Sequence, residues 1–319
     1  MHDCSGAAAM TATAFAPVNV ALIKYWGKED DKLRLPANSS LSVNLTNLGT
    51  MTTVEWDTSL TRDEADERMI QHLDRIRKLA KIDLKAKVTT KNNFPAATGL
   101  SSSASGLAAL TLAATAAAGL KLSEKDLSRL ARLGSGSACR SIPAGWTEWV
   151  TGNDKTSYAQ TIFPINHWDL RILVVILSTE KKTVSSTAGQ AATATSPFYV
   201  TRIKSIDAKI RRIKAAIKQK NFTQMGEIME ADCLNMHQVM RTQQPPLDYL
   251  SPGTKAVMQA IRQWREEGLE SYFTINTGQN VLVFCEPKNE EGLVDKLSHT
   301  GCVIEVKRDR VGLGARLLA

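Results

Sequence analysis

The pattern of apolar and polar positions divides the chain into a first part rich in strands and a second part rich in helices. Apolar and β-branched runs predict the strands of the first part, which are 12–23, 40–45, 50–56 and 84–90. A near-continuous apolar run at 170–177 predicts one more, buried strand, and long helical patterns follow it. We therefore expect two domains, 1–180 and 181–319, with the boundary near residue 180.

Apolar residues at helical spacing, with capping signals, predict the helices, which are 62–79, 104–120, 123–134, 202–220, 222–240, 254–267 and 289–297. Shorter apolar runs predict further strands at 272–275, 281–285 and 302–306. From Ile203 to Ile217, isoleucine recurs every three or four positions, which is the spacing of a stripe that faces a core. The run at 104–120 is shorter than the ~20 residues of a membrane span, so we interpret it as a buried helix. Mixed strands and helices indicate an α+β fold.

Composition and charge narrow the class of protein. The 319 residues are 43% apolar and 23% charged, which is typical of a globular protein and excludes a collagen-like or disordered chain. The net charge of +8 favours an anionic partner: a phosphorylated metabolite, a nucleic acid or a membrane surface. Eight basic residues and one acid between Arg202 and Lys220 account for most of this charge, and no aromatic residue lies among them. That pattern disfavours binding to single-stranded nucleic acid, and we expect neither a nucleic-acid nor a membrane partner.

The cysteines and the first residues bear on the compartment. Five cysteines lie far apart, form no CxxC pair and are odd in number, namely Cys4, Cys139, Cys233, Cys285 and Cys302. Neither a zinc ribbon nor a disulfide framework is indicated by this arrangement. The first fifteen residues contain Asp3 and no Lys or Arg, which argues against an export signal. We expect a cytoplasmic protein.

A loop rich in glycine and serine at 93–105, NFPAATGLSSSAS, joins a predicted strand to a predicted helix. Successive backbone N–H groups and hydroxyls in such a loop can bind phosphate oxygens, and the helix directs the positive end of its dipole at the same anion. The loop lacks the Walker pattern GxxxxGK[ST], so it predicts a different nucleotide cradle. A capped helix start with incidental serines is the alternative. The candidate nucleotide-binding residues are Gly99, Ser101, Ser102, Ser103 and Ser105.

Six segments between residues 16 and 280 resemble, in the same order, the signatures of diphosphomevalonate decarboxylases. They are APVNVALIKYWGK (16–28) with LPANSSLS (35–42), the loop 93–105, GSGSACRS (134–141), SSTAG (185–189), TSP (195–197) with Arg202, and FTINTGQN (273–280). The family lies in the superfamily of galactokinase, homoserine kinase, mevalonate kinase and phosphomevalonate kinase. Six segments in register argue against an accidental similarity.

The resemblance implies a fold and a reaction. The implied fold has an N-terminal domain like ribosomal protein S5 domain 2 and a ferredoxin-like C-terminal domain, with the substrate in the cleft between them. The implied reaction uses ATP and Mg²⁺ to phosphorylate the 3-hydroxyl of mevalonate 5-diphosphate, and loss of that phosphate drives decarboxylation to isopentenyl diphosphate. No protein-only set of oxygen ligands is evident, so we expect Mg²⁺ to arrive with the phosphates. The family is commonly dimeric, which makes a homodimer an expected assembly.

The resemblance also implies roles for individual residues. Lys24 and Lys28, with Tyr25 between them, would supply two cations and a phenol to a diphosphate and a carboxylate. Arg140 follows a Gly-Ser-Gly-Ser turn and could clamp a phosphate or carboxylate with two parallel hydrogen bonds. Asn19 would orient the hydroxyl end of the substrate. The alternatives are solvated lysines, a surface salt bridge at Arg140, and core hydrogen bonding at Asn19.

Ser185 and Ser186 open a predicted helix, so their hydroxyls and free N–H groups could bind the substrate diphosphate. Simple capping of the helix is the alternative role for these serines.

One catalytic position departs from the family. Asn276 stands where family members carry an aspartate beside the 3-hydroxyl of the substrate. An amide does not accept a proton near neutral pH, and a positioned acid–base group contributes ~10²- to 10⁴-fold in rate. Gln279 replaces a neighbouring proline, Thr277 replaces a small residue, and the segment 56–69 is shorter than the strand pair usual there.

The departure leaves three functions open. The leading one is a diphosphomevalonate decarboxylase in which Asn276 is either a substitution made to trap the substrate or a lineage change that is compensated elsewhere. The second is an ATP-dependent 3-kinase of mevalonate or a phosphomevalonate that stops before decarboxylation, because phosphoryl transfer depends mainly on positioning and charge neutralisation. The third is a catalytically weak protein retained for binding a metabolite or a partner.

Overall fold

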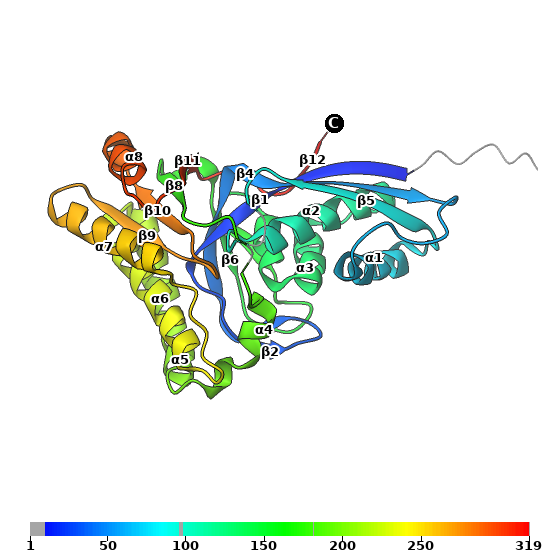
Figure 1. The fold of residues 1–319 in the computed structure, drawn as a ribbon. Coiled ribbons are helices and arrows are strands. Elements are labelled where there is room, and N and C mark those ends of the chain that lie inside the picture. The colour runs from blue at the N-terminus through cyan, green and yellow to red at the C-terminus, as the bar shows by residue number, and fades with distance from the viewer. Residues whose placement is uncertain (1–9, 96–97, 181, 319) are drawn as a thin grey trace, which may run out of the picture.

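The computed structural model describes residues 10–95, 98–180 and 182–318 and contains two sheets with helices packed on them (Figure 1). Cys4 and the two alanines at 96 and 97 of the predicted phosphate loop lie outside the described residues. The architecture is α+β, as the sequence predicted.

The first sheet is antiparallel and follows the order β12-β1-β4-β6-β7, with β5 paired to β4. Its strands are β1 (Met10–Ile23), β4 (Ser40–Asp57), β5 (Lys85–Asn92), β6 (Trp146–Trp149), β7 (Ala159–Phe163) and β12 (Arg316–Leu318). The pairing of β1 with β4 shifts register twice near the end of β1, between Pro17 and Asn19 and between Ala21 and Ile23. Such bulges bend a strand and redirect its side chains. The second of them lies directly before Lys24.

Three helices lie on one face of this sheet (Figure 1). They are α1 (Glu67–Ala80), α2 (Ser102–Ala117) and α3 (Glu124–Gly134). The alanine-rich α2 is almost wholly buried against β1 and β4, because small side chains let the helix approach the strands closely. This confirms the prediction of a buried helix rather than a membrane span. No helix of the described residues is both long and apolar enough to cross a membrane.

The second sheet is also antiparallel and follows the order β11-β8-β10-β9. Its strands are β8 (Arg171–Ile176), β9 (Ser271–Thr274), β10 (Val281–Cys285) and β11 (Glu305–Arg310). The helices around it are α5 (Tyr199–Gln219), α6 (Phe222–Thr242), α7 (Pro252–Glu266) and α8 (Glu290–Ser298). Alternate residues of its strands enter different cores: Val174 joins the core with α5 and α6, whereas Val175 joins the core with α7 and α8.

One hydrophobic core joins the two halves of the chain. Val20 of β1 and Val43 of β4 share it with Ile172 of β8, Ile213 of α5 and Met229 of α6. The isoleucine stripe predicted for 202–220 therefore packs against both sheets, and the end of β1 is held by residues from both halves.

The chain enters the second sheet earlier than the predicted domain boundary near 180. All strand partners of β8, which starts at Arg171, belong to the second sheet, and β12 returns the chain to the first sheet. We propose that the division lies between β7 and β8. The apolar pattern of a single strand does not show which strands it pairs with, so the sequence alone does not place the run at 170–177 in either sheet.

The other differences have local causes. The predicted strands 40–45 and 50–56 form one strand, β4, because Thr46, Asn47 and Leu48 bond through their N–H groups to Asp309 while the strand continues. The predicted strand 302–306 is instead β11, Glu305–Arg310, whose charged sequence hides its pairing with β8. The short strands β6, β7 and β12 carried no signal that was recognised.

Close packing of α6 on β9 generates a stability prediction. A Cβ at Gly226 would overlap the buried ring of Tyr272, whereas a Cβ at Gly106 in α2 would meet no atom within 4 Å. We expect Gly226→Ala to lower the free energy of unfolding by about 1–3 kcal/mol through overpacking, and Gly106→Ala to raise it by about 0.4–1 kcal/mol. Denaturant unfolding of both variants measures this, and equal effects would contradict it.

Candidate active site

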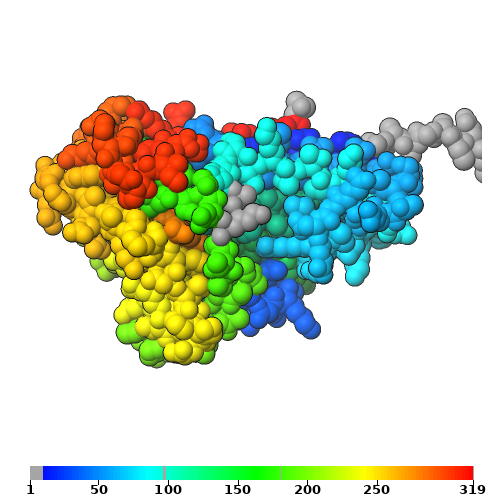
Figure 2. Space-filling view, viewed as in Figure 1, coloured from blue at the N-terminus to red at the C-terminus, as the bar shows by residue number. Residues whose placement is uncertain are grey.

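Most residues that the sequence predicted for the site line one cavity of about 270 Å³. It lies where the end of β1, the start of α2, the 3-10 helix η1 (Gly136–Ser141) and the start of α4 (Ser186–Ala191) meet. Figure 2 shows α4 in green against the blue segment with β2 (Lys28–Asp30) and β3 (Leu35–Pro36). The predicted residues that line the cavity are Lys24, Tyr25, Lys28, Gly99, Ser101, Ser102, Ser103, Arg140, Ser185, Ser186 and Asn276.

The cavity is strongly cationic. Six basic side chains and no carboxylate of the described residues line it, the six being Lys24, Lys28, Arg34, Arg68, Arg140 and Lys182. Within the described ranges, only Lys28 of the six forms an ion pair, with the exposed Asp31. Burying cations without counter-charges is unfavourable unless a ligand supplies the anion. The cavity is therefore suited to a ligand with several negative charges.

Lys24 and Asn276 meet at the floor of the cavity. Nζ of Lys24 donates a hydrogen bond to Oδ1 of Asn276 at 2.8 Å, and Nδ2 of Asn276 donates to Oγ of Ser101 at 3.2 Å. The pKa of Lys24 is lowered to about 8, chiefly by burial; Cys233 and Asp232 oppose the shift, and the nearby Arg140 adds to it. The amide of Asn276 thus bridges the lysine and the phosphate loop without adding a charge.

Arg140 is buried beside Lys24 with little to neutralise it. Its Nη1 donates to Oγ of Ser40 at 2.8 Å and its Nη2 to Oδ1 of Asn19 at 3.1 Å. Its Nε has no hydrogen-bond partner among the described residues. Burial lowers the pKa of Arg140. A buried guanidinium with a free donor points to an anionic group of a ligand, not to the surface salt bridge considered as an alternative.

Two predicted residues do not line the cavity. Asn19 lies behind Arg140, where its Nδ2 donates to Ser141 Oγ at 2.8 Å and its Oδ1 receives the guanidinium. Ser105 lies inside α2, with its hydroxyl 2.7 Å from that of Thr50. Both side chains are fully buried, so the geometry favours the core hydrogen-bonding alternative for Asn19 and a structural role for Ser105.

The phosphate loop turns sharply before α2. Gly99 and Ser101 both have positive φ, +94° and 60°, and a Cβ at Gly99 would overlap the backbone of Gly278. This close approach brings the loop beside the segment that carries Asn276. Ser101 precedes α2 without a side-chain capping hydrogen bond, and no acidic residue lies in the first turn. The helix therefore presents its positive end to the cavity.

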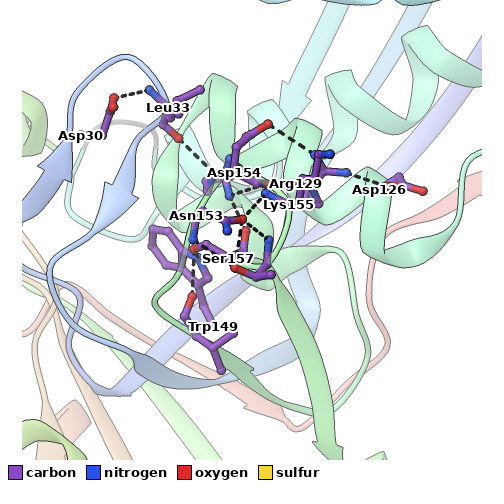
Figure 3. A network of polar contacts seen from close by, with 12 residues as sticks. Asp30, Leu33, Asp126, Arg129, Trp149, Asn153, Asp154, Lys155 and Ser157 are labelled. Atoms are coloured by element: carbon purple, nitrogen blue, oxygen red, sulfur yellow. Dashed lines mark hydrogen bonds and ion pairs between the residues drawn. The ribbon is translucent and has the colours of Figure 1, made fainter.

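Figure 3 shows a polar network that includes Trp149, Ser157, Asp154 and Arg129. The ring of Tyr25 packs edge-on against Trp149 at 4.6 Å, and the indole N–H of Trp149 donates to Ser157 Oγ at 2.9 Å. Asp154 of the same loop accepts hydrogen bonds from Arg129 and Arg132 of α3. Burial raises the pKa of Tyr25, so its phenol stays a hydrogen-bond donor at neutral pH.

The start of α4 contributes serine hydroxyls to the cavity, and the segment before it contributes Lys182, which the sequence analysis did not predict. Ser185 caps α4 by accepting from the N–H of Ala188 at 3.1 Å, which is the alternative role considered for it. Ser186 Oγ lies 2.7 Å from Thr277 Oγ1 and accepts from Lys182 Nζ at 2.9 Å. Burial lowers the pKa of Lys182 to about 8.

Sequence reasoning missed several lining residues, namely Arg34, Arg68, Ser135, Ser137 and Lys182. Ser135 and Ser137 stand in the quoted segment GSGSACRS, so that segment could have revealed them. Arg34 and Arg68 carried no local signal, because they reach the cavity from the β2–β3 turn and from α1 to donate to the carbonyls of Leu133 and Gly134 at the end of α3.

Comparisons with known proteins agree with this geometry. Residues 16–159 match the family model described as the diphosphomevalonate decarboxylase-like N-terminal domain, and residues 172–312 match the mevalonate 5-diphosphate decarboxylase C-terminal domain. The diphosphomevalonate decarboxylase of Ganoderma lucidum is 37% identical over 321 residues, which cover 89% of this chain and 80% of the relative. The chain belongs to the diphosphomevalonate decarboxylase family. Among solved structures of that family, the decarboxylase from Staphylococcus aureus superposes with a TM-score of 0.91 at 37% identity and covers 97% of this chain and 98% of its own.

A mevalonate diphosphate decarboxylase structure from Enterococcus faecalis has a TM-score of 0.89 at 40% identity and covers 98% of this chain and 99% of its own. A structure described as MDDEF in complex with MVAPP, AMPPCP and magnesium has a TM-score of 0.91, with the same identity and coverage. The recognised resemblance and the two-domain α+β fold of the decarboxylase family are confirmed for this chain.

The site geometry predicts that Arg140 cannot be replaced by lysine. Lysine has a single head group and cannot bond Ser40, Asn19 and an anion at once. We expect Arg140→Lys to lose about 2–5 kcal/mol of apparent binding or transition-state energy, measured from kcat/KM. Arg308→Lys, at an exposed ion pair with Glu291 outside the cavity, is the matched control and should leave the kinetics unchanged. Wild-type kinetics in Arg140→Lys would show that Arg140 does not contact the reacting molecule.

Proposed function

We propose that this protein uses ATP to phosphorylate the 3-hydroxyl of mevalonate 5-diphosphate, and that loss of the new phosphate drives decarboxylation to isopentenyl diphosphate. The observation that carries the proposal is the cavity with six cations and no described carboxylate in a chain of the decarboxylase family. A nucleoside triphosphate and mevalonate 5-diphosphate together carry enough negative charge to neutralise such a cavity. The ligands named for the complex of a solved relative have this chemistry.

The phosphate loop and α2 are suited to the ATP phosphates. Ser102 and Ser103, at the start of α2, line the cavity, where the helix dipole favours an anion. Within the described ranges no cluster of three His, Cys, Asp or Glu residues could hold a metal ion. Mg²⁺ fits a site made of phosphate oxygens and hydroxyls, where it would neutralise the charge on the transferred group.

The substrate would lie between Arg140 and the opposite wall of the cavity. Arg140 and Lys24 are placed to bind the carboxylate and the 3-hydroxyl end, while Tyr25, Lys28 and Ser186 are placed to bind the diphosphate. Asn19 acts through Arg140 by holding its guanidinium, so it is a positioning residue.

Asn276 favours a second candidate function, a 3-kinase. Lys24 can neutralise charge on the transferred phosphoryl group, and this requires no carboxylate. Departure of the 3-phosphate instead builds positive charge on the tertiary carbon, which a fixed anion stabilises far better than an amide does. The first half-reaction is therefore less affected by Asn276 than the second.

One experiment separates these functions. The protein is incubated with Mg²⁺-ATP and each of mevalonate, its 5-phosphate and its 5-diphosphate, and both ADP and carbon dioxide are measured. One carbon dioxide per ADP with the diphosphate supports the decarboxylase. ADP with a stable 3-phosphate and no carbon dioxide supports the kinase, and the absence of both products supports a binding protein.

Restoring the carboxylate should raise turnover. An aspartate at 276 could accept hydrogen bonds from both Lys24 and Ser101, so Asn276→Asp preserves the local contacts while adding an anion. We expect carbon dioxide release to increase ~10²-fold or more, mainly in kcat, because the interaction strengthens as charge develops. Asn153→Asp adds the same charge outside the cavity and should have no effect. An ordinary rate in the unchanged protein, with no gain in Asn276→Asp, would contradict the role of this position.

The protonation of Lys24 predicts a pH dependence. The pKa of Lys24 is lowered to about 8 by burial, so its ammonium form and the rate of ADP formation should decline as the pH rises through about 8. A carboxylate at 276 favours the ammonium form and should raise the pKa of Lys24 by about 1–3. The alkaline limb of the pH–rate profile should then move to higher pH in Asn276→Asp.

Lys182 needs a control, because burial also lowers its pKa to about 8. Lys182→Arg keeps a cation there and removes its titration. An alkaline limb that disappears in Lys182→Arg and stays unmoved in Asn276→Asp would assign the limb to Lys182. The cytoplasmic location and the homodimer stay predictions.

A further inference from the structure

We propose that Arg202 and Asp232 are positioning residues that hold the peptide of Lys24 in place for the reaction. The inference rests on the proposed function, in which Lys24 contacts the transferred phosphoryl group. Arg202 lies in α5 and Asp232 in α6, and neither lines the cavity.

The contacts run to both polar groups of one residue. The backbone N–H of Lys24 donates to Oδ2 of Asp232 at 2.8 Å, and its carbonyl accepts from Nη2 of Arg202 at 3.1 Å. A second hydrogen bond to the same carbonyl comes from Nδ2 of Asn38 at 2.9 Å. Lys24 follows the second bulge of β1, where the regular pairing with β4 ends. Its backbone groups therefore bond the side chains of Asp232, Arg202 and Asn38 instead of a neighbouring strand.

Arg202 and Asp232 form a closed, fully buried pair. Nη1 of Arg202 bonds Oδ1 of Asp232 at 2.8 Å and Nη2 bonds Oδ2 at 3.1 Å, with both side chains 0% exposed. Lys209 is a second donor to Oδ1 of Asp232, at 3.0 Å. A buried ion pair is weak evidence for stability, because desolvation offsets its attraction. Its fixed, forked geometry instead orients whatever it bonds.

Cys233, the next residue of α6, bonds the backbone next to Asn276, whose side chain bonds Lys24. Sγ of Cys233 accepts from the N–H of Ile275 at 3.2 Å, and Ile275 directly precedes Asn276. Two successive residues of one helix therefore bond the backbones of the two segments that carry Lys24 and Asn276. This arrangement fixes the 2.8 Å contact between those two side chains.

The test replaces the pair and keeps the charge balance. Arg202→Met with Asp232→Leu removes both charges of the buried pair together. Lys209, 20% exposed, loses its ion pair but keeps the hydrogen bond to Oδ1 of Asn235. We expect the double variant to fold, which circular dichroism and thermal unfolding check. We expect kcat for ADP formation to fall about 10²-fold, as misplacement by about 1 Å can cause, while KM for ATP stays unchanged. Asp232→Asn alone should lower kcat in the same direction.

Asp63→Asn is the matched control. Asp63 also accepts from an arginine, Arg77, and from a backbone N–H, that of Ala86 at 2.7 Å, but it lies outside the cavity. We expect this variant to keep the wild-type kcat even though it loses stability. A folded double variant with wild-type kcat, or an equal loss of kcat in Asp63→Asn, would overturn the proposal.

A second measurement does not depend on activity. The ε-carbon resonance of Lys24, assigned with Lys24→Met, is titrated by NMR in the full-length protein. In the wild type we expect a pKa of about 8. The double variant loses Asp232, which raises this pKa, and Arg202, which lowers it, so their removal does not by itself move the pKa upward. We expect the pKa to rise toward 10.5 in the double variant, because a released lysine regains water. If the wild type forms no ADP while this titration behaves as expected, the proposed function fails and the positioning stands. An unchanged pKa in the folded double variant would overturn the positioning.

Discussion

Burial of cations without carboxylate partners is the constraint on which the site depends. Lys24 and Arg140 lie side by side in the interior, and their neighbours are an amide, hydroxyls and a phenol. Neutral dipoles can orient a cation without neutralising it, so the charge stays available to a ligand. The cost of keeping these cations apart from carboxylates is offset by the stability of the surrounding core.

That core is shared by both sheets, and this determines where the cleft can lie. Apolar residues of β1 and β4 pack with α5, α6 and β8, so the two halves meet over a large buried area rather than through a flexible linker. The end of β1 leads from this core into the cavity. There the backbone of Lys24 bonds Asp232 of α6, which lies more than two hundred positions further along the chain. Geometry at the reacting centre is therefore set by the join between the halves.

Asn276 alters the electrostatics while preserving the hydrogen bonds. Its carbonyl accepts from Lys24 and its amino group donates to Ser101, so each neighbour stays satisfied. The difference from an aspartate is the missing charge, so no anion at this position opposes the lowering of the Lys24 pKa by burial. In the proposed reaction, this charge matters more for decarboxylation than for phosphoryl transfer.

The sequence by itself determined the elements with strong periodicity and the residues in contiguous motifs. The isoleucine stripe of α5, the buried α2, Lys24, Arg140 and Asn276 all carried a local signal. Only the tertiary structure decided that Asn19 and Ser105 lie outside the cavity and that β8 belongs to the second sheet. It alone also decided that Arg34 and Arg68 line the cavity and that Asp232 bonds the backbone of Lys24. Strand partners, burial and electrostatic neighbours are fixed by contacts through space between distant segments, and a local pattern of residues does not contain them.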